Sequence, residues 1–160
     1  MAKIKEYNRK NAIKYAEKWA YSRNPAYFDF SEIGGDCTNF ISQCLYAGSG
    51  VMNYTPVHGW YYRDLNDRSP SWTGVNLLHN FLIGNTVRGV FAEKVSADKI
   101  EVGDVIQLIS EEGQRYHSLL VTGLGEDIYV AAHTLNSYMR PLSSYTYGKA
   151  DYLHISGVYN

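Results

Sequence analysis

Small and apolar residues in the first half of the chain recur with the spacing of α-helices. The first stripe lies on one side of a helix that is expected to begin near Asn8, and its members are Ala12, Ile13, Ala16, Trp19 and Ala20. Pro25 disfavours helical geometry at the residue before it, so we expect a loop through residues 24–27. The pattern therefore predicts a helix followed by a loop at the start of the chain.

A second helical stripe begins at Cys37, with apolar positions at Phe40, Ile41, Cys44 and Leu45. Asp36 is the expected N-cap, because its carboxylate can accept hydrogen bonds from the N–H groups of the first turn. Gly48 is the expected stop signal. A third, shorter helix is predicted after Thr73, its expected cap, with Val75, Leu78 and Leu82 as its buried face and Gly84 at its end.

From residue 102 onward the apolar period changes to that of β-strands. Turn residues at 111–113 and 123–127 separate the runs, which predict strands over residues 105–109, 116–122, 128–133 and 152–158. Helices followed by an antiparallel meander indicate an α+β domain. No linker or repeat divides the chain, so we expect residues 1–160 to form a single domain.

An aromatic-rich loop is predicted between the second and third helices, over residues 49–72. Loops this long in compact domains are often functional. Its rings are Tyr54, Trp60, Tyr61, Tyr62 and Trp72. They can line a substrate groove or form a small satellite core. We favour the groove for Trp60 and Tyr61 and the core for Trp72.

The composition narrows the function classes. A formal net charge of -1 and a pI of about 6.5 argue against a nucleic-acid partner. No apolar run is long enough for a membrane span, and the first residues lack the apolar core of a secretion signal. The compartment stays open between a secreted or cell-wall location, with the signal absent from this sequence, and the cytoplasm. The chain has 15 tyrosines, and such an excess favours binding surfaces.

Cys37 is the candidate nucleophile. The thiolate is the reactive form of cysteine, and a helix N-terminus favours it. Cys44 is interpreted as a small core residue. On one helix the two Cα atoms would lie about 10 Å apart, too far for a disulfide. No Cys/His spacing suits a zinc site, and the expected chemistry needs no metal or cofactor.

Two histidines are candidates for the base and its orienting partner. A hairpin centred on Gly125 would pair Thr122 with Ile128 and place His117 opposite His133, close enough for their rings to hydrogen-bond. His117 would then take the Cys37 proton, and His133 would orient it. Asn136 is the competing orienter. A one-residue slip of the strands would put the two rings on opposite faces.

The oxyanion of an acyl-transfer intermediate needs two donors. The Cys37 backbone N–H is one, and Asn24 and Tyr27 are both candidates for the other. Asp36 beside the sulfur would disfavour the thiolate if the two touched, which is a further reason to expect its carboxylate to turn back and cap the helix.

Several of these motifs together resemble a bacterial family, the putative amidase domain. They are Tyr7-Asn8-Arg9, Arg23-Asn24-Pro25, the run Asp36-Cys37-Thr38-Asn39-Phe40-Ile41-Ser42-Gln43-Cys44, Ser71-Trp72, Val102-Gly103-Asp104-Val105, His117 and His133-Thr134. The run around Cys37 is the specific part. One departure is Gly48-Ser49-Gly50, where the family pattern has two adjacent glycines.

The resemblance implies a branch of the papain-like superfamily, beside the NlpC-type cell-wall peptidases and the CHAP amidases. It implies a cysteine helix packed on an antiparallel sheet, a base such as His117 on a strand, and a histidine such as His133 as the third polar group. The implied activity is hydrolysis of a peptide amide through a thioester, on peptide or peptidoglycan-like substrates. The alternatives are a non-catalytic module that binds cell-wall peptide or glycan, and acyl transfer to another amine.

Overall fold

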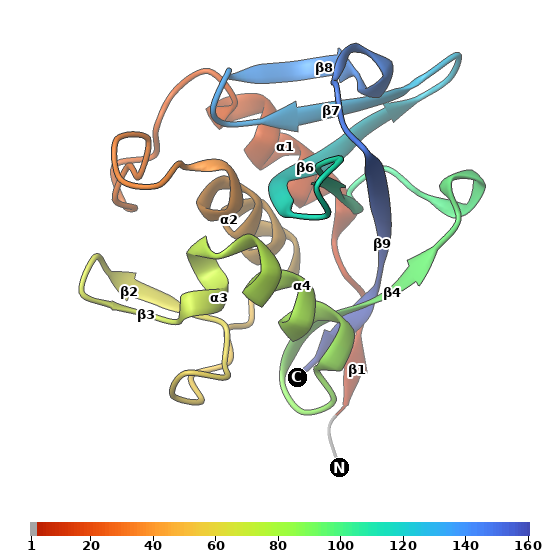
Figure 1. Ribbon diagram of the computed structural model, residues 1–160. Coiled ribbons are helices and arrows are strands. Elements are labelled where there is room, and N and C mark those ends of the chain that lie inside the picture. The colour runs from red at the N-terminus through yellow and green to blue at the C-terminus, as the bar shows by residue number, and fades with distance from the viewer. Residues whose placement is uncertain (1–2) are drawn as a thin grey trace.

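The computed structural model describes residues 3–160 as four α-helices and a large antiparallel sheet (Figure 1). The first helix, α1 (Arg9–Trp19), begins at the predicted place, because the Asn8 side chain accepts a hydrogen bond from the backbone N–H of Asn11. Its buried face contains Ala12 and Ala16. These small residues let α1 pack closely on α2 (Cys37–Ser49).

Helix α2 begins at Cys37, as predicted, but does not stop at Gly48. It runs to Ser49, and Gly50 is the left-handed C-cap, with φ of 67°. Gly48 has a packing role instead, since a Cβ there would lie 2.5 Å from the Tyr7 ring. Ten of the helix's 13 residues are buried. In Figure 1, α2 lies in the interior, between the other helices and the sheet.

The segment after α2 contains a small hairpin and two further helices. The hairpin pairs β2 (Tyr62–Asp64) with β3 (Asp67–Arg68). Helix α3 (Pro70–Thr73) and helix α4 (Val75–Gly84) follow. The predicted third helix therefore starts one residue late, because Gly74 rather than Thr73 occupies the cap position. Leu78 and Leu82 are its buried residues together with Phe81.

The large sheet is antiparallel throughout, in the order β1-β9-β5-β6-β7-β8, with β4 also pairing with β9. Its strands are β1 (Ile4–Lys5), β4 (Gly89–Val95), β5 (Val105–Ile109), β6 (Arg115–Leu124), β7 (Ile128–Ala132), β8 (Ser137–Pro141) and β9 (Lys149–Tyr159). The α+β expectation and the meander are confirmed. β1, β4 and β8 were not predicted, and 3₁₀ turns η1 (Ala97–Lys99) and η2 (Leu142–Ser144) complete the fold.

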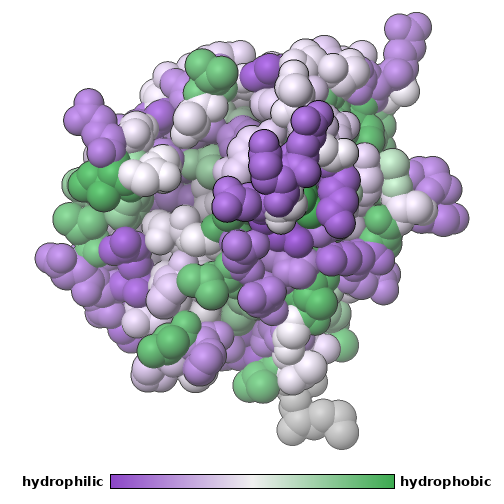
Figure 2. Space-filling model, in the orientation of Figure 1, coloured by the Kyte–Doolittle hydropathy of each residue, from purple (hydrophilic) through white to green (hydrophobic). Residues whose placement is uncertain are grey.

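The two faces of the sheet carry separate apolar cores. Val105, Leu120 and Ala131 face the helices, whereas Ile106 and Leu119 belong to a second cluster closed by η2 and its flanking tyrosines. On the surface in Figure 2, apolar residues are scattered between hydrophilic ones. No helix within residues 3–160 is long and apolar enough to cross a membrane.

Candidate active site

Cys37 is the first residue of α2 and is partly exposed. Its Sγ lies 3.7 Å from the hydroxyl of Thr38, and that hydroxyl lies 3.0 Å from the Ser118 hydroxyl on β6. Within residues 3–160, neither His117 nor His133 is hydrogen-bonded to this sulfur. The candidate nucleophile is thus linked to the sheet through its neighbour Thr38, and its own side chain remains partly exposed.

Cys44 lies two turns deeper in α2 and is fully buried. Burial raises the pKa of its thiol well above the usual value. Both cysteines are free. The interpretation of Cys44 as a core residue is confirmed, and Cys37 is left as the accessible thiol.

The Asp36 carboxylate does not cap α2, so that prediction is wrong. It is fully buried and turns away from the helix axis. One oxygen accepts from the Phe30 backbone N–H at 2.8 Å and from the Asn39 side chain at 2.9 Å, and the other lies 2.5 Å from Nδ1 of His133. These donors satisfy a buried carboxylate better than a single cap contact would.

The orientation of Asp36 has a consequence for the first turn of α2. With no side chain capping it, the N–H groups of Cys37 and Thr38 have no acceptor within residues 3–160. Helix N-termini leave such groups free, and they favour negative charge. The predicted oxyanion donor at Cys37 is therefore available.

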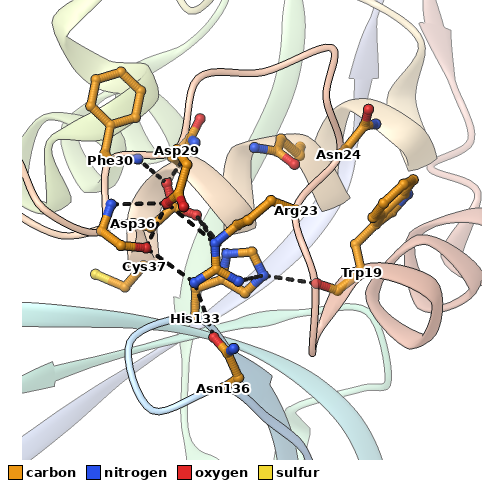
Figure 3. A network of polar contacts seen from close by, with 12 residues as sticks. Trp19, Arg23, Asn24, Asp29, Phe30, Asp36, Cys37, His133 and Asn136 are labelled. Atoms are coloured by element: carbon orange, nitrogen blue, oxygen red, sulfur yellow. Dashed lines mark hydrogen bonds and ion pairs between the residues drawn. The ribbon is translucent and has the colours of Figure 1, made fainter.

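His133 is buried at the end of β7 and packs face to face on Phe40, with ring centroids 3.9 Å apart. Its Nδ1 contacts Asp36, and its Nε2 lies 2.8 Å from the Trp19 carbonyl oxygen. Both nitrogens are therefore engaged. His133 joins the ends of α1 and β7 to the start of α2 (Figure 3).

Arg23 completes this network, although no role was predicted for it. Its Nε lies 3.2 Å from Asp29 and 3.6 Å from Asp36. Its Nη2 donates to the Ser31 hydroxyl and to the Asn136 side-chain oxygen, both at 3.1 Å. Figure 3 shows the guanidinium between these groups. The available signal in the sequence was the position of Arg23 in the Arg23-Asn24-Pro25 motif, because the burial of Asp36 is visible only in the structure.

His117 and His133 are not paired, and the predicted hairpin register is wrong. Leu120 pairs with Ala131 and Leu124 with Ile128, with an irregularity between Val121 and Gly123. Continuing the Leu120 register places His133 opposite Ser118, whose side chain faces α2. His117, one residue earlier on β6, faces the other way.

The His117 ring packs beside Tyr116 and Tyr145, with centroids 6.2 and 5.9 Å away. Burial lowers the pKa of His117 from 6.5 to about 4, and the charge of Arg140 adds to the effect. The imidazole is therefore neutral at neutral pH. Neither ring nitrogen is hydrogen-bonded within residues 3–160, so Asn136, which is held by Arg23, does not orient it.

The two proposed second oxyanion donors differ in their contacts. Asn24 donates to the Tyr15 hydroxyl at 3.2 Å and accepts from the Ala26 N–H. Tyr27 stacks on Trp72, and burial raises the pKa of its hydroxyl to about 12. Neither is hydrogen-bonded to Cys37 among the described residues.

Trp60 is a core residue, so its assignment to a groove is wrong. It is fully buried, donates to the Ser42 hydroxyl at 3.1 Å and packs on Trp72. The core assignment of Trp72 is confirmed. Tyr61 remains half-buried, and its ring lies with Tyr54 around the Arg63 guanidinium.

Several residues of the family motifs are structural. The Asp104 carboxylate is fully buried and contacts Arg9 at 2.8 Å and His154 at 2.9 Å. Gly103 has a φ of 92°, and its carbonyl accepts from the Tyr7 hydroxyl. The Gly-Asp motif thus joins β5 to the start of α1 and to β9.

Comparison with known proteins gives a family and two relatives. The family described as Putative amidase domain matches residues 6–156. The chain is 39% identical over 141 residues to the uncharacterized protein YhbB of Bacillus subtilis (strain 168). The matched region covers 84% of this chain and 44% of YhbB. The chain is 26% identical over 168 residues to the uncharacterized protein YjcM of the same organism, covering 98% of this chain and 38% of that protein.

The chain therefore spans less than half the length of these two relatives. No solved structure matches it. The family match covers nearly the whole described fold, including both α2 and the strands that carry the histidines. By this match, the chain belongs to the putative amidase domain family.

Proposed function

We propose that this protein is a cysteine-dependent amide hydrolase of papain-like fold, related to the NlpC-type peptidases and CHAP amidases, with Cys37 as its nucleophile. The observation that carries the proposal is the position of Cys37. It is the accessible one of two free thiols and stands at the first residue of a buried helix whose N–H groups are free. That position favours both a thiolate and a developing oxyanion.

In the proposed reaction, Cys37 Sγ attacks the amide carbonyl carbon while a base removes the thiol proton. The carbonyl oxygen becomes an oxyanion that accepts from the N–H groups of Cys37 and Thr38. The C–N bond then breaks, the amine leaves with the proton, and a thioester remains. Water attacks the thioester, releases the carboxylic acid and restores the thiol. No step requires a metal or cofactor.

We assign the base to His117. It is neutral near pH 7, so one ring nitrogen carries a hydrogen and the other can accept a proton. The Thr38–Ser118 contact places β6 beside the first turn of α2, one residue from His117. Because the ring faces Tyr145 here, catalysis requires it to turn toward α2 when substrate binds. The β5–β6 register shifts between the Leu108–His117 pair and the Ile109–Arg115 pair, which weakens the ladder where that turn would occur.

The proposed substrate is a peptide amide of the cell wall. The half-buried Tyr61, exposed Tyr54 and Arg63 form an aromatic and cationic surface on the β2–β3 side of the fold, suited to contacts with peptide or sugar. The direct test digests purified peptidoglycan with wild type and Cys37→Ala and identifies released fragments by mass spectrometry. New termini that appear with wild type and are absent with Cys37→Ala support the proposal. Equal release by both proteins contradicts it.

A non-catalytic binding module is the second candidate, and it is favoured by the lack of a hydrogen bond between His117 and the Cys37 sulfur among the described residues. Such a module would sediment with peptidoglycan without releasing fragments. It would also keep its affinity in Cys37→Ala and lose it in a Tyr54→Ala, Tyr61→Ala double variant. Fragment release by wild type rules this candidate out as the complete function.

A further inference from the structure

The contacts of His133 fix where its protons lie. Nε2 is 2.8 Å from the Trp19 carbonyl oxygen, which can only accept, so this nitrogen carries a proton. Nδ1 is 2.5 Å from Asp36, whose other oxygen already accepts from Phe30 and Asn39. That carboxylate also forms an ion pair with Arg23 Nε at 3.6 Å, and an ionised carboxylate can only accept. Both ring nitrogens are then donors.

The charges around His133 are balanced by this assignment. Two cations, the His133 imidazolium and Arg23, face two carboxylates, Asp36 and Asp29. Nη1 of Arg23 is 3.2 Å from His133 Nε2 but also 3.2 Å from the Ser22 carbonyl oxygen, so it has an acceptor other than the protonated ring. A buried charge is tolerated when it is paired and hydrogen-bonded in this way.

We infer that His133 is held as an imidazolium between Asp36 and Trp19, and that His133 and Arg23 are positioning residues that set the backbone of the Cys37 turn. We call His133 and Arg23, with their hydrogen-bond partners, the clamp. It contacts three places: the end of α1, the β7–β8 turn through Asn136, and Asp36. Because Asp36 directly precedes Cys37, a shift of its carboxylate moves the thiol and the free N–H groups together. His133 is thereby excluded as acid, base or orienter of His117.

The β7–β8 turn is itself strained, as expected of a segment held by outside contacts. Thr134 and Leu135 have φ of 62° and 60°, although neither is glycine or asparagine. On the facing side, Gly35 has a φ of 102°, and a Cβ there would lie 3.9 Å from the Thr134 hydroxyl oxygen. The clamp therefore holds two unusual backbone segments together beside Cys37.

The first experiment is NMR of the histidine side chains in the full chain at neutral pH. Two protonated His133 nitrogens with nearly equal ¹⁵N shifts are expected. One protonated and one bare nitrogen would overturn the imidazolium assignment. This readout needs neither substrate nor turnover, so it stands apart from the proposed hydrolase activity.

The second experiment compares Arg23→Gln with Arg9→Gln. Arg9 is a matched control, since its side chain is 27% exposed against 26% for Arg23 and it also pairs with a buried aspartate, Asp104. The measurement is the rate of Cys37 alkylation by iodoacetamide in folded protein, followed by peptide mass spectrometry. We expect a change of about tenfold or more for Arg23→Gln and less than about twofold for Arg9→Gln, a tenfold change being 1.4 kcal/mol.

Equal rates in wild type and Arg23→Gln would overturn the positioning role, as would equal changes in the two variants. Arg23→Lys, which keeps the charge, provides a second test if Arg23→Gln does not fold, and it should recover part of the wild-type rate. The inference rests on the proposed function where it concerns turnover, for which Arg23→Gln should lower kcat with little change in KM. If wild type releases no fragments, the proposed hydrolase function is contradicted. The alkylation rates still test whether Arg23 positions the Cys37 turn.

Discussion

The hydroxyl of Thr38 lies 3.0 Å from the hydroxyl of Ser118, and this contact joins the first turn of α2 to the middle strand of the meander. Both residues are buried, and Ser118 also accepts from Gln107 at 3.2 Å. The contact sets the distance between the strand that carries His117 and the helix that begins with Cys37. It is therefore the structural link on which the proposed chemistry depends.

Removing that link should reduce stability and turnover together. Thr38→Val leaves the Ser118 hydroxyl with one partner fewer in a buried site, which should cost about 1–3 kcal/mol. Urea unfolding of Thr38→Val, Ser118→Ala and the double variant measures the coupling between the two hydroxyls. Additive losses would show that they do not interact in solution.

Asp36 should be among the most sensitive positions. Asp36→Ala leaves His133 and Arg23 without their buried partner, and breaking a buried ion pair from one side costs about 3–5 kcal/mol. Chemical denaturation measures the loss. Asp67→Ala is the control, because its pair with Arg63 is exposed and should contribute less than about 1 kcal/mol. Similar losses at both positions would contradict the burial of Asp36.

His117 predicts a pH dependence of stability. Its folded pKa of about 4 lies below the unfolded value of 6.5, so between these values the unfolded chain binds more protons and stability rises with pH. The free energy of unfolding therefore has its full value, as far as His117 is concerned, above about pH 6.5. It decreases by up to about 3 kcal/mol as the pH falls to about 4. Unfolding at pH 7 and pH 4.5 should show a smaller pH effect in His117→Gln than in wild type. The exposed His58 serves as control, and His58→Gln should retain the wild-type pH effect.

The two cysteines should differ sharply in labelling. Cys37 is partly exposed and should react with iodoacetamide in the folded protein, whereas Cys44 is fully buried and its raised pKa keeps it as the thiol. Peptide mass spectrometry of native and urea-unfolded samples separates the sites. Native labelling of Cys44 at a rate near that of Cys37 would be inconsistent with the buried position in α2.

Trp72 should be required for folding rather than for substrate contact. Its ring packs on Trp60 with centroids 4.8 Å apart, and its indole N–H donates to Asn39 at 3.0 Å. Trp72→Ala should cost about 3–5 kcal/mol, measured by thermal or urea unfolding. Tyr54→Ala, at an exposed ring, should change stability by less than about 0.5 kcal/mol.

Much of the fold could be predicted because the start of a helix and the extent of a strand depend mainly on residues close together in the sequence. The start of α2 at Cys37 and the strand at 105–109 follow from periodicity within one element. The pairing of β6 with β7 depends on an irregularity between Val121 and Gly123, which no alternation reveals. A shift of one residue was enough to place His117 and His133 on opposite faces.

The other errors arose from long-range contacts. Asp36 has the residue type of a helix cap, but its partners Phe30 and His133 lie elsewhere in the chain, and 97 residues separate it from the histidine. Trp60 has the residue type of a sugar-binding ring, but Ser42 offers its indole a buried acceptor. In both cases tertiary structure supplied a partner that the local sequence does not contain.

The family pattern contains residues that hold the fold together and a residue proposed for catalysis, and the buried Asp104, with Arg9 and Gly103, belongs to the first group. These residues hold the start of α1 against β5 and β9, and none of them touches Cys37 among the described contacts. A homologue that keeps them while losing the cysteine is expected to adopt the same architecture without the nucleophile. Membership of the family thus reports ancestry and shape, and a catalyst has to be recognised separately, by the thiol at the head of the second helix.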